Sequence, residues 1–160
     1  TGDSGTSSRV FGSFLTWMQE KDKPVFVIAT ANNIDRLPPE FLRKGRFDEI
    51  FFVDLPTSSE RVSIWDLHLN KRIKSEQVRG DLVIDNTLFT ELAALSADYS
   101  GAEIEQAVVA GLYSAAANDA ELDTDSLIQA ISNTKPLSVV MAEKIASLRL
   151  WAKGRTVPAD

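Results

Sequence analysis

The spacing of hydrophobic residues changes at Pro56, and this change constrains the fold more than any other feature of the sequence. Before it, two apolar runs, residues 25–31 (VFVIATA) and 49–55 (EIFFVDL), lack the alternation of polar and apolar residues seen in half-exposed strands. Such runs are typical of parallel strands buried on both faces of a sheet. After Pro56, apolar residues recur at intervals of three and four, which predicts helices. We therefore expect an α/β part, residues 1–56, and an all-helical part, residues 57–160.

The α/β part is predicted to run helix, strand, short helix, strand. Apolar residues within residues 9–21 have helical spacing. Pro38 and Pro39 suit the first turn of a short helix, and Gly45 suits its left-handed C-terminal cap. Two parallel strands need further strands and crossover helices to cover both faces of a sheet. We therefore expect these residues to be the last part of a larger α/β domain.

The helical part is predicted to contain four or five helices. The first opens with a capping box, Thr57 to Glu60, and runs through Leu69. The others are expected at about residues 87–96, 101–118, 124–133 and 138–153. Their predicted N-terminal caps are Asn86, Ser100 with Glu103 as box partner, Asp123 or Thr124, and Ser138.

Composition and charge exclude several classes of function. The chain has no cysteine and one histidine, which excludes disulfides and thiolate metal sites and argues against a protein-ligated zinc site. A net charge of −6 gives no general attraction to nucleic acid or to an anionic membrane. No apolar run approaches the roughly 20 residues that span a bilayer, and the first residues lack the order of a signal peptide. We expect a protein of the cytoplasm or of an organelle stroma.

Two short motifs suggest phosphate chemistry. Asn32 directly follows the first apolar run, where open α/β sheets bind ligands, and its neutral amide could orient a water molecule. Alternatively, Asn32 and Asn33 simply form a turn. Arg43, Lys44 and Arg46 gather positive charge around a glycine. Alternatively, these cations stabilise the dipole at a helix C-terminus.

The segment ATANNIDRLPPEFLRKGRFDEIFFVDLP, residues 29–56, resembles AAA+ ATPases of the valosin-containing and katanin type. The helical part follows in the position of the helical lid of that family. The last segment, residues 134–155, is similar to the tail of AAA+ proteins encoded in cyanobacterial and chloroplast genomes.

The resemblance implies roles for six residues. Asn32 would be sensor 1, which holds the attacking water, and Arg43 and Arg46 would be arginine fingers that reach the nucleotide of a neighbouring subunit. The implied nucleotide-binding residues are His68, Gly101 and Ala102. Ala102 stands where many relatives have a sensor-2 arginine. From the residues alone, His68 could instead favour a helix C-terminus. Ser100 caps the next helix with Glu103 as box partner, which can be true at the same time as the nucleotide-binding role of Gly101.

The resemblance also implies a function, namely ATP hydrolysis coupled to the remodelling of a protein substrate in a ring expected to be hexameric. ATP and Mg²⁺ are the implied cofactors. The sequence contains no G-x-x-x-x-G-K-[S/T] and no apolar run ending in Asp-Glu, so we expect both motifs upstream and an inactive chain without them. The alternative is a non-catalytic assembly or interaction module of a degenerate relative. The acidic balance disfavours nucleic-acid remodelling.

Overall fold

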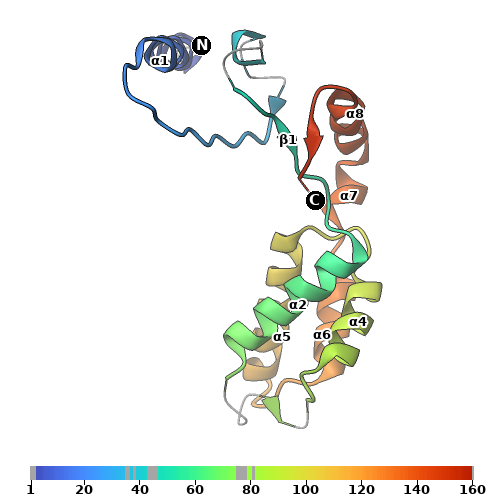
Figure 1. The fold of residues 1–160 in the computed structure, drawn as a ribbon. Helices are drawn as coiled ribbons and strands as arrows, with labels where there is room; N and C mark the ends of the chain where they lie inside the picture. The colour runs from blue at the N-terminus through green and yellow to red at the C-terminus, as the bar shows by residue number, and fades with distance from the viewer. Residues whose placement is uncertain are drawn as a thin grey trace. The chain divides into compact units, whose positions relative to one another are not determined.

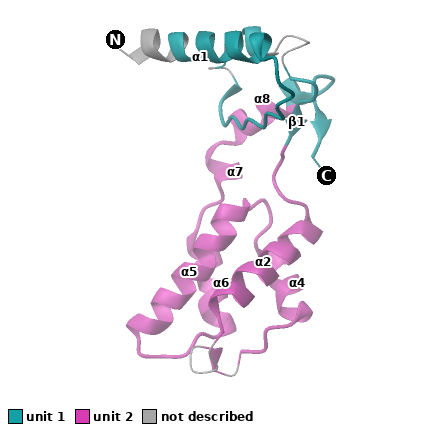
Figure 2. Cartoon of the chain, turned by 60° about the vertical axis from the view of Figure 1, so that its left-hand side comes forward, with its two compact units in different colours: residues 1–52, 150–160 teal, residues 53–149 magenta. Residues whose placement is uncertain are grey.

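The computed structural model describes residues 3–34, 37, 39–42, 47–74, 79–80 and 82–159. Its elements, in chain order, are α1 (Asp3–Glu20), the 3-10 helix η2 (Pro39–Leu42), β1 (Phe51–Phe52), α2 (Ser58–Arg72), α4 (Asn86–Leu95), α5 (Gly101–Ala117), α6 (Thr124–Asn133), α7 (Leu137–Val140), α8 (Ala142–Ala152) and β2 (Val157–Pro158) (Figure 1). They divide between two compact units, unit 1 with Thr1–Phe52 and Leu150–Asp160, and unit 2 with Val53–Arg149 (Figure 2). Within the described residues, no helix is long and apolar enough to cross a membrane.

Unit 2 has its own hydrophobic core, to which α2, α4, α5 and α6 all contribute. The largest fully buried apolar side chains are those of Trp65, Leu69, Leu92, Ile104, Val108, Leu122 and Leu127. Among the described residues, Ser96 is the one polar residue that is buried as a whole, and its hydroxyl is hydrogen-bonded. Trp65 Nε1 donates to Ser96 Oγ at 3.0 Å, and Ser96 Oγ donates to Leu92 O at 2.7 Å. The three- and four-residue spacing in the sequence therefore corresponds to the buried faces of packed helices.

Three of the helix starts in unit 2, those of α2, α5 and α6, have the predicted caps. Thr57 caps α2, since Glu60 N donates to Thr57 Oγ1 and Thr57 N donates to Glu60 Oε2 at 2.7 Å. Ser100 and Glu103 form the same reciprocal box at α5. Asp123 caps α6, which was one of the two predicted candidates. These short-range hydrogen bonds satisfy amides that a helix leaves unpaired.

Two caps and one helix were predicted wrongly. Asp85, not Asn86, caps α4, and its Oδ1 accepts from Leu88 N at 3.0 Å. The helix expected at 138–153 is two helices, α7 and α8, separated at Met141, whose φ of −121° and ψ of 30° are not helical. Ser138 lies inside α7, because Pro136 precedes that helix with no side-chain cap.

Unit 1 contains α1, η2 and the described sheet. β1 pairs in parallel with β2, with Phe51 opposite Val157 and Phe52 opposite Pro158. Phe41 of η2 is buried against α1, where its ring packs edge-on against Phe11 at a centroid distance of 5.2 Å. Aromatic packing therefore joins the predicted first helix to the short helix after the double proline. Gly45, the predicted cap of the short helix, lies outside the described residues.

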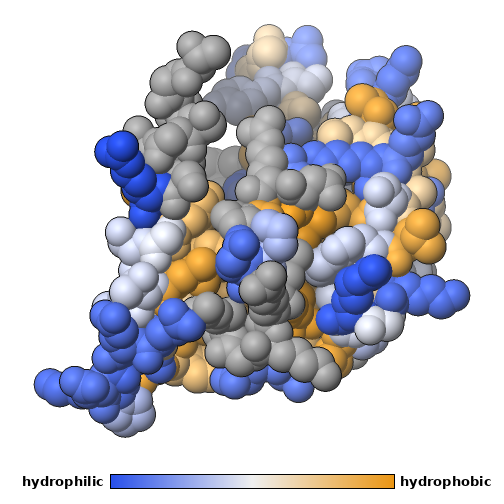
Figure 3. Space-filling model, turned by 90° about the horizontal axis from the view of Figure 1, so that it is seen from above, coloured by the Kyte–Doolittle hydropathy of each residue, from blue (hydrophilic) through white to orange (hydrophobic). Residues whose placement is uncertain are grey.

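The strand predicted at residues 25–31 is not formed. The segment has no regular structure, and Phe26 and Ile28 are 90% and 81% exposed. The second predicted strand, residues 49–55, is reduced to the two residues of β1. A strand is stable only when a neighbouring strand pairs with its backbone, and among the described residues the sheet has only the strands β1 and β2. Exposed apolar side chains are also visible between polar ones in the space-filling view (Figure 3).

Arg149 of α8 and Asp54 form a two-pronged ion pair within unit 2. Arg149 Nε lies 2.8 Å from Asp54 Oδ2, and Arg149 Nη2 lies 2.9 Å from Asp54 Oδ1. Partial burial raises the pKa of Asp54, but the hydrogen bond from Arg149, the amide of Leu55 and the charge of Arg149 together lower it below its ordinary value. Both side chains are about half exposed, so the pair contributes little to stability, less than about 1 kcal/mol.

This ion pair predicts a pH dependence of stability. Because the folded-state pKa of Asp54 is lowered, its contribution is complete above the unfolded-state pKa of about 3.9 and is lost as the pH falls through the lower folded-state value. A double-mutant cycle with Asp54→Asn and Arg149→Met, measured by urea unfolding, should show a coupling energy at pH 7 that declines in this acidic range. A coupling energy that grew on acidification would contradict this assignment.

Candidate functional site

Helices α2 and α5 bring two of the predicted site residues onto facing sides. His68 lies in the C-terminal half of α2 with a side chain 14% exposed, and Gly101 is the first residue of α5. Ile64, one turn before His68, is the neighbour of Gly101: a Cβ atom added to the glycine would lie 3.7 Å from Ile64 Cδ1. The packing of α2 on α5 thus places the start of one helix beside the His68 face of the other.

The use of glycine at position 101 is not explained by packing within the described residues. A Cβ atom there would make only an ordinary van der Waals contact with Ile64. Positive φ angles occur at Gly80 and Gly154 but not at Gly101, so its backbone conformation does not need glycine either. A site where a side chain would fit but none is present leaves room for a close approach from outside.

A charged pair extends the His68 face by one turn. Arg72, four residues after His68 on α2, points its Nη1 at His68 Nδ1 with a separation of 3.0 Å. Arg72 Nη2 also donates to Glu105 Oε1 on α5, which lies 3.9 Å from His68 Nδ1. The hydrogen bond from Arg72 has the largest effect and lowers the pKa of Glu105; desolvation opposes it, and the positive charge of Arg72 lowers the pKa further. His68 is among the predicted site residues, whereas Arg72 and Glu105 are not.

The start of α5 is fixed by the predicted capping box of Ser100 and Glu103, which is compatible with a ligand at this turn. Ser100 Oγ and N both donate to Glu103 Oε2, at 2.7 Å and 2.8 Å. The other oxygen of Glu103 accepts from Leu137 N at 2.5 Å, which ties the start of α5 to the start of α7. Ala102, the third predicted nucleotide-binding residue, is exposed in the first turn of α5. The cap leaves Gly101 and Ala102 at the surface of this turn.

The other predicted residues belong to unit 1. Asn32 is exposed, in a bend directly after the segment 25–31, and its amide is open to solvent. Asn33 differs, because its side-chain Oδ1 is buried and has no hydrogen-bond partner among the described residues. Arg43 and Arg46 lie outside the described residues. Their predicted roles therefore stay predictions.

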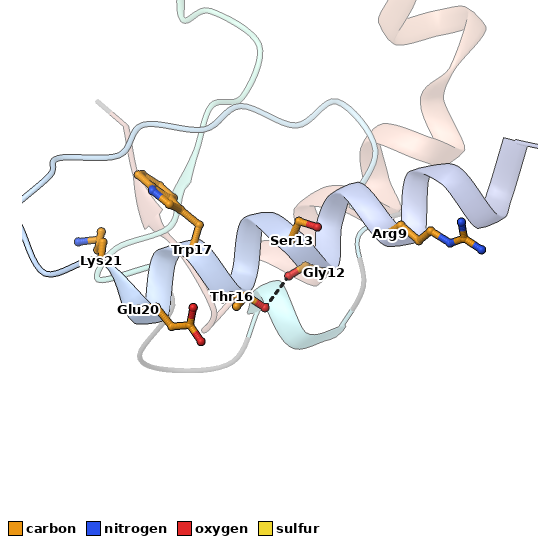
Figure 4. Close-up of a pocket in the computed structure, with 7 residues that line it drawn as sticks. All are labelled: Arg9, Gly12, Ser13, Thr16, Trp17, Glu20 and Lys21. Atoms are coloured by element: carbon orange, nitrogen blue, oxygen red, sulfur yellow. Dashed lines mark hydrogen bonds between the residues drawn. The ribbon is translucent and has the colours of Figure 1, made fainter.

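The described residues contain no group of side chains that could hold a metal ion, and the hollow found along α1 is shallow. No group of three histidine and carboxylate side chains there is close enough to hold a metal ion. A shallow hollow runs along α1 (Figure 4). It is lined by Arg9, Gly12, Ser13, Thr16, Trp17, Glu20 and Lys21. Thr16 Oγ1 donates to Gly12 O at 3.1 Å, a hydrogen bond within the helix. One helix face of this kind does not define a ligand site.

Residues 1–55 match the family model described as the ATPase family associated with various cellular activities (AAA). This match covers most of unit 1, including the predicted residues Asn32, Arg43 and Arg46.

Similarity to individual proteins extends over most of the chain. The AAA domain-containing protein ycf46 of Pyropia yezoensis is 48% identical over 151 residues, which cover 94% of this chain and 29% of that protein. The cell division cycle protein 48 homolog of Archaeoglobus fulgidus is 36% identical over 106 residues, which cover 65% of this chain and 13% of that protein. The chain thus spans less than a third of the length of these relatives.

The fold also resembles a solved structure. The AAA domain of FIGL-1, determined in complex with ADP, superposes with a TM-score of 0.75 at 20% identity. The match covers 96% of this chain and 54% of that chain. It confirms the predicted fold class, the end of an α/β domain followed by an all-helical unit.

Proposed function

The chain belongs to the AAA family of ATPases, and from this we propose that it forms the C-terminal part of an ATP-hydrolysing module. Residues 1–56 would complete the α/β nucleotide-binding domain, and residues 57–160 would be its helical lid. The observation that carries the proposal is the surface formed by His68 of α2 and by Gly101 and Ala102 at the start of α5, which we call the α2–α5 face. There the largely buried His68 lies one helical turn from Ile64, the neighbour of Gly101, and internal packing does not require glycine at position 101.

The adenosine end of ATP suits this face. The His68 ring offers a nitrogen for hydrogen bonding, and the first turn of α5, at Gly101 and Ala102, allows close approach of a ligand to the backbone. ATP, when bound, supplies the phosphoanhydride bond whose hydrolysis drives the work. Mg²⁺ has no ligand cluster among the described residues. We therefore assign no residue of the described part to the metal.

The phosphate end is assigned to residues of the α/β part. Asn32, exposed after the segment 25–31, would orient the attacking water. Arg43 and Arg46 would reach the γ-phosphate of ATP held by a neighbouring subunit, because a planar guanidinium binds phosphate oxygens at two points. This arrangement requires a ring, which we propose to be hexameric. The proposed work of the ring is the remodelling of a protein substrate.

Hydrolysis by the full-length protein tests this proposal. Asn32→Ala should lower kcat by about 10²-fold or more and change KM little, because a water-positioning contact matters mainly in the transition state. Thr30→Ala, at an exposed position two residues earlier, is the matched control and should keep normal turnover. Steady-state phosphate release measures both.

The same experiment distinguishes the alternative function. If the full-length wild-type protein binds ATP or assembles but releases no phosphate, the chain is part of a non-catalytic assembly module. The 160-residue chain alone should show neither turnover nor tight nucleotide binding by calorimetry. Micromolar Mg-ATP binding to the chain alone would mean that the phosphate-binding residues are within it.

A further inference from the structure

The contact between Arg72 and His68 determines which ring nitrogen of the histidine carries the hydrogen. A guanidinium has five N–H donors and no acceptor. His68 Nδ1, 3.0 Å from Arg72 Nη1, must therefore accept a hydrogen bond. In a neutral imidazole one nitrogen accepts and the other carries the hydrogen, so Nε2 is the N–H donor.

Glu105 is compatible with the Nε2–H tautomer of His68, because it binds Arg72 and not the ring. A carboxylate beside a histidine ordinarily accepts a hydrogen bond from the ring and so favours the opposite tautomer. Here Glu105 Oε1 is 3.9 Å from His68 Nδ1, too far for a hydrogen bond, and it accepts from Arg72 Nη2 instead. The three side chains are 14%, 23% and 43% exposed in the order His68, Arg72, Glu105, so the histidine is the most protected from water.

We propose that Arg72, held by Glu105, is a positioning residue that presents His68 to the nucleotide as an Nε2–H donor. This inference rests on the proposed function, which places the base of ATP at the α2–α5 face. Nδ1 is occupied by Arg72, so Nε2 is the ring nitrogen that remains for a ligand. A donor at this position selects an unprotonated ring nitrogen, such as those of adenine, over a ring N–H.

Nuclear magnetic resonance tests the tautomer directly, because the chain has a single histidine. With ¹⁵N-labelled histidine at a pH where the ring is neutral, the wild-type chain should show a hydrogen on Nε2 and none on Nδ1. A wild-type spectrum with the hydrogen on Nδ1 would overturn the proposal, and this result does not depend on any variant folding.

Variants of α2 and α5 test whether Arg72 determines the tautomer of His68. Arg72→Met removes the donor and frees Glu105, so the spectrum should move toward the Nδ1–H tautomer. Glu105→Gln keeps an acceptor for Arg72 and should retain the wild-type spectrum. Lys71→Met is the matched control, since it removes a positive charge from the adjacent, exposed position on α2. An Arg72→Met spectrum identical to that of the wild type would mean that Arg72 does not set the tautomer.

Nucleotide binding to the full-length protein tests whether His68 Nε2 donates a hydrogen bond to a ring nitrogen of adenine. ATP and its 1-deaza, 3-deaza and 7-deaza analogues each differ by one ring nitrogen. In the wild type and in Lys71→Met, one of these analogues should bind about 3- to 10-fold more weakly than ATP binds, which is the effect of one lost hydrogen bond. In Arg72→Met, the ratio of the dissociation constant of that analogue to the dissociation constant of ATP should fall toward one. Ratios equal in wild type and Arg72→Met would overturn the proposal.

A His68→Ala variant distinguishes the role of Arg72 from the binding of nucleotide at the α2–α5 face. If His68→Ala leaves ATP affinity unchanged, the nucleotide does not use the α2–α5 face, and that part of the proposed function is wrong. In that case the wild-type tautomer spectrum would still show whether Arg72 orders the ring. If His68→Ala weakens binding but Arg72→Met leaves the deaza ratios unchanged, only the role of Arg72 is wrong.

Discussion

Replacing Arg43 or Arg46 by alanine in the full-length protein is expected to lower ATP turnover by about 10³-fold or more. The reason is that an arginine finger stabilises charge that develops on the phosphoryl group in the transition state. Nucleotide affinity should change little, because the ground state depends less on this contact. Steady-state phosphate release and a separate nucleotide-binding titration measure the two quantities.

Lys44→Ala provides the matched control for these variants. Lys44 lies between the two arginines in sequence and carries the same charge. If the three cations only stabilise a helix C-terminus, all three substitutions should cost similar small amounts of stability, well under about 1 kcal/mol, and little activity. Turnover near wild type in both arginine variants would end the arginine-finger assignment.

The largest effect on stability is expected for Trp65→Ala. Trp65 is fully buried between the helices of unit 2, and alanine would leave a large cavity in that core. The free energy of unfolding should fall by about 3–5 kcal/mol. Leu67→Ala, on the same helix at a position 60% exposed, should change it by less than about 0.5 kcal/mol. Urea unfolding followed by circular dichroism compares the two variants.

Trp65→Phe separates packing from hydrogen bonding. Phenylalanine keeps most of the buried ring but cannot donate to Ser96 Oγ. Ser96 still donates to Leu92 O, so its hydroxyl is not left unpaired. The loss should therefore be smaller than that of Trp65→Ala. A loss below about 1 kcal/mol for Trp65→Ala would contradict the burial described for this residue.

Helices were predictable where the information that specifies them is local. The capping boxes at Thr57 and Ser100 involve residues three apart, and both form as predicted. The break at Met141 has no Pro or Gly at that position, so the local sequence gave no sign of it. The strand prediction for segment 25–31 was wrong because a strand does not depend on local sequence alone. Its apolar composition favours a strand, but a strand depends on partners distant in sequence.

In the candidate site too, residues within a local motif were predicted and a contact between distant residues was not. His68 and Gly101 were found through a resemblance to known motifs, and the structure places them on packed helices. Arg72 and Glu105 were missed because their pairing joins residues 33 positions apart on different helices. Each lies four residues after a predicted site residue, and this helical spacing was the available signal. Neither charge nor spacing within one helix shows that Arg72 pairs with Glu105 on the other helix.

The central claim is that each nucleotide site combines residues of two subunits, Asn32 from one and the arginines from its neighbour. The most direct measurement is ATP turnover by rings formed from co-expressed Asn32→Ala and Arg43→Ala proteins, each expected to be nearly inactive alone. Random assembly in equal amounts gives about one interface in four with both groups intact. We predict that turnover returns to as much as about a quarter of the wild-type value. Mixed rings no more active than either variant alone would contradict the claim.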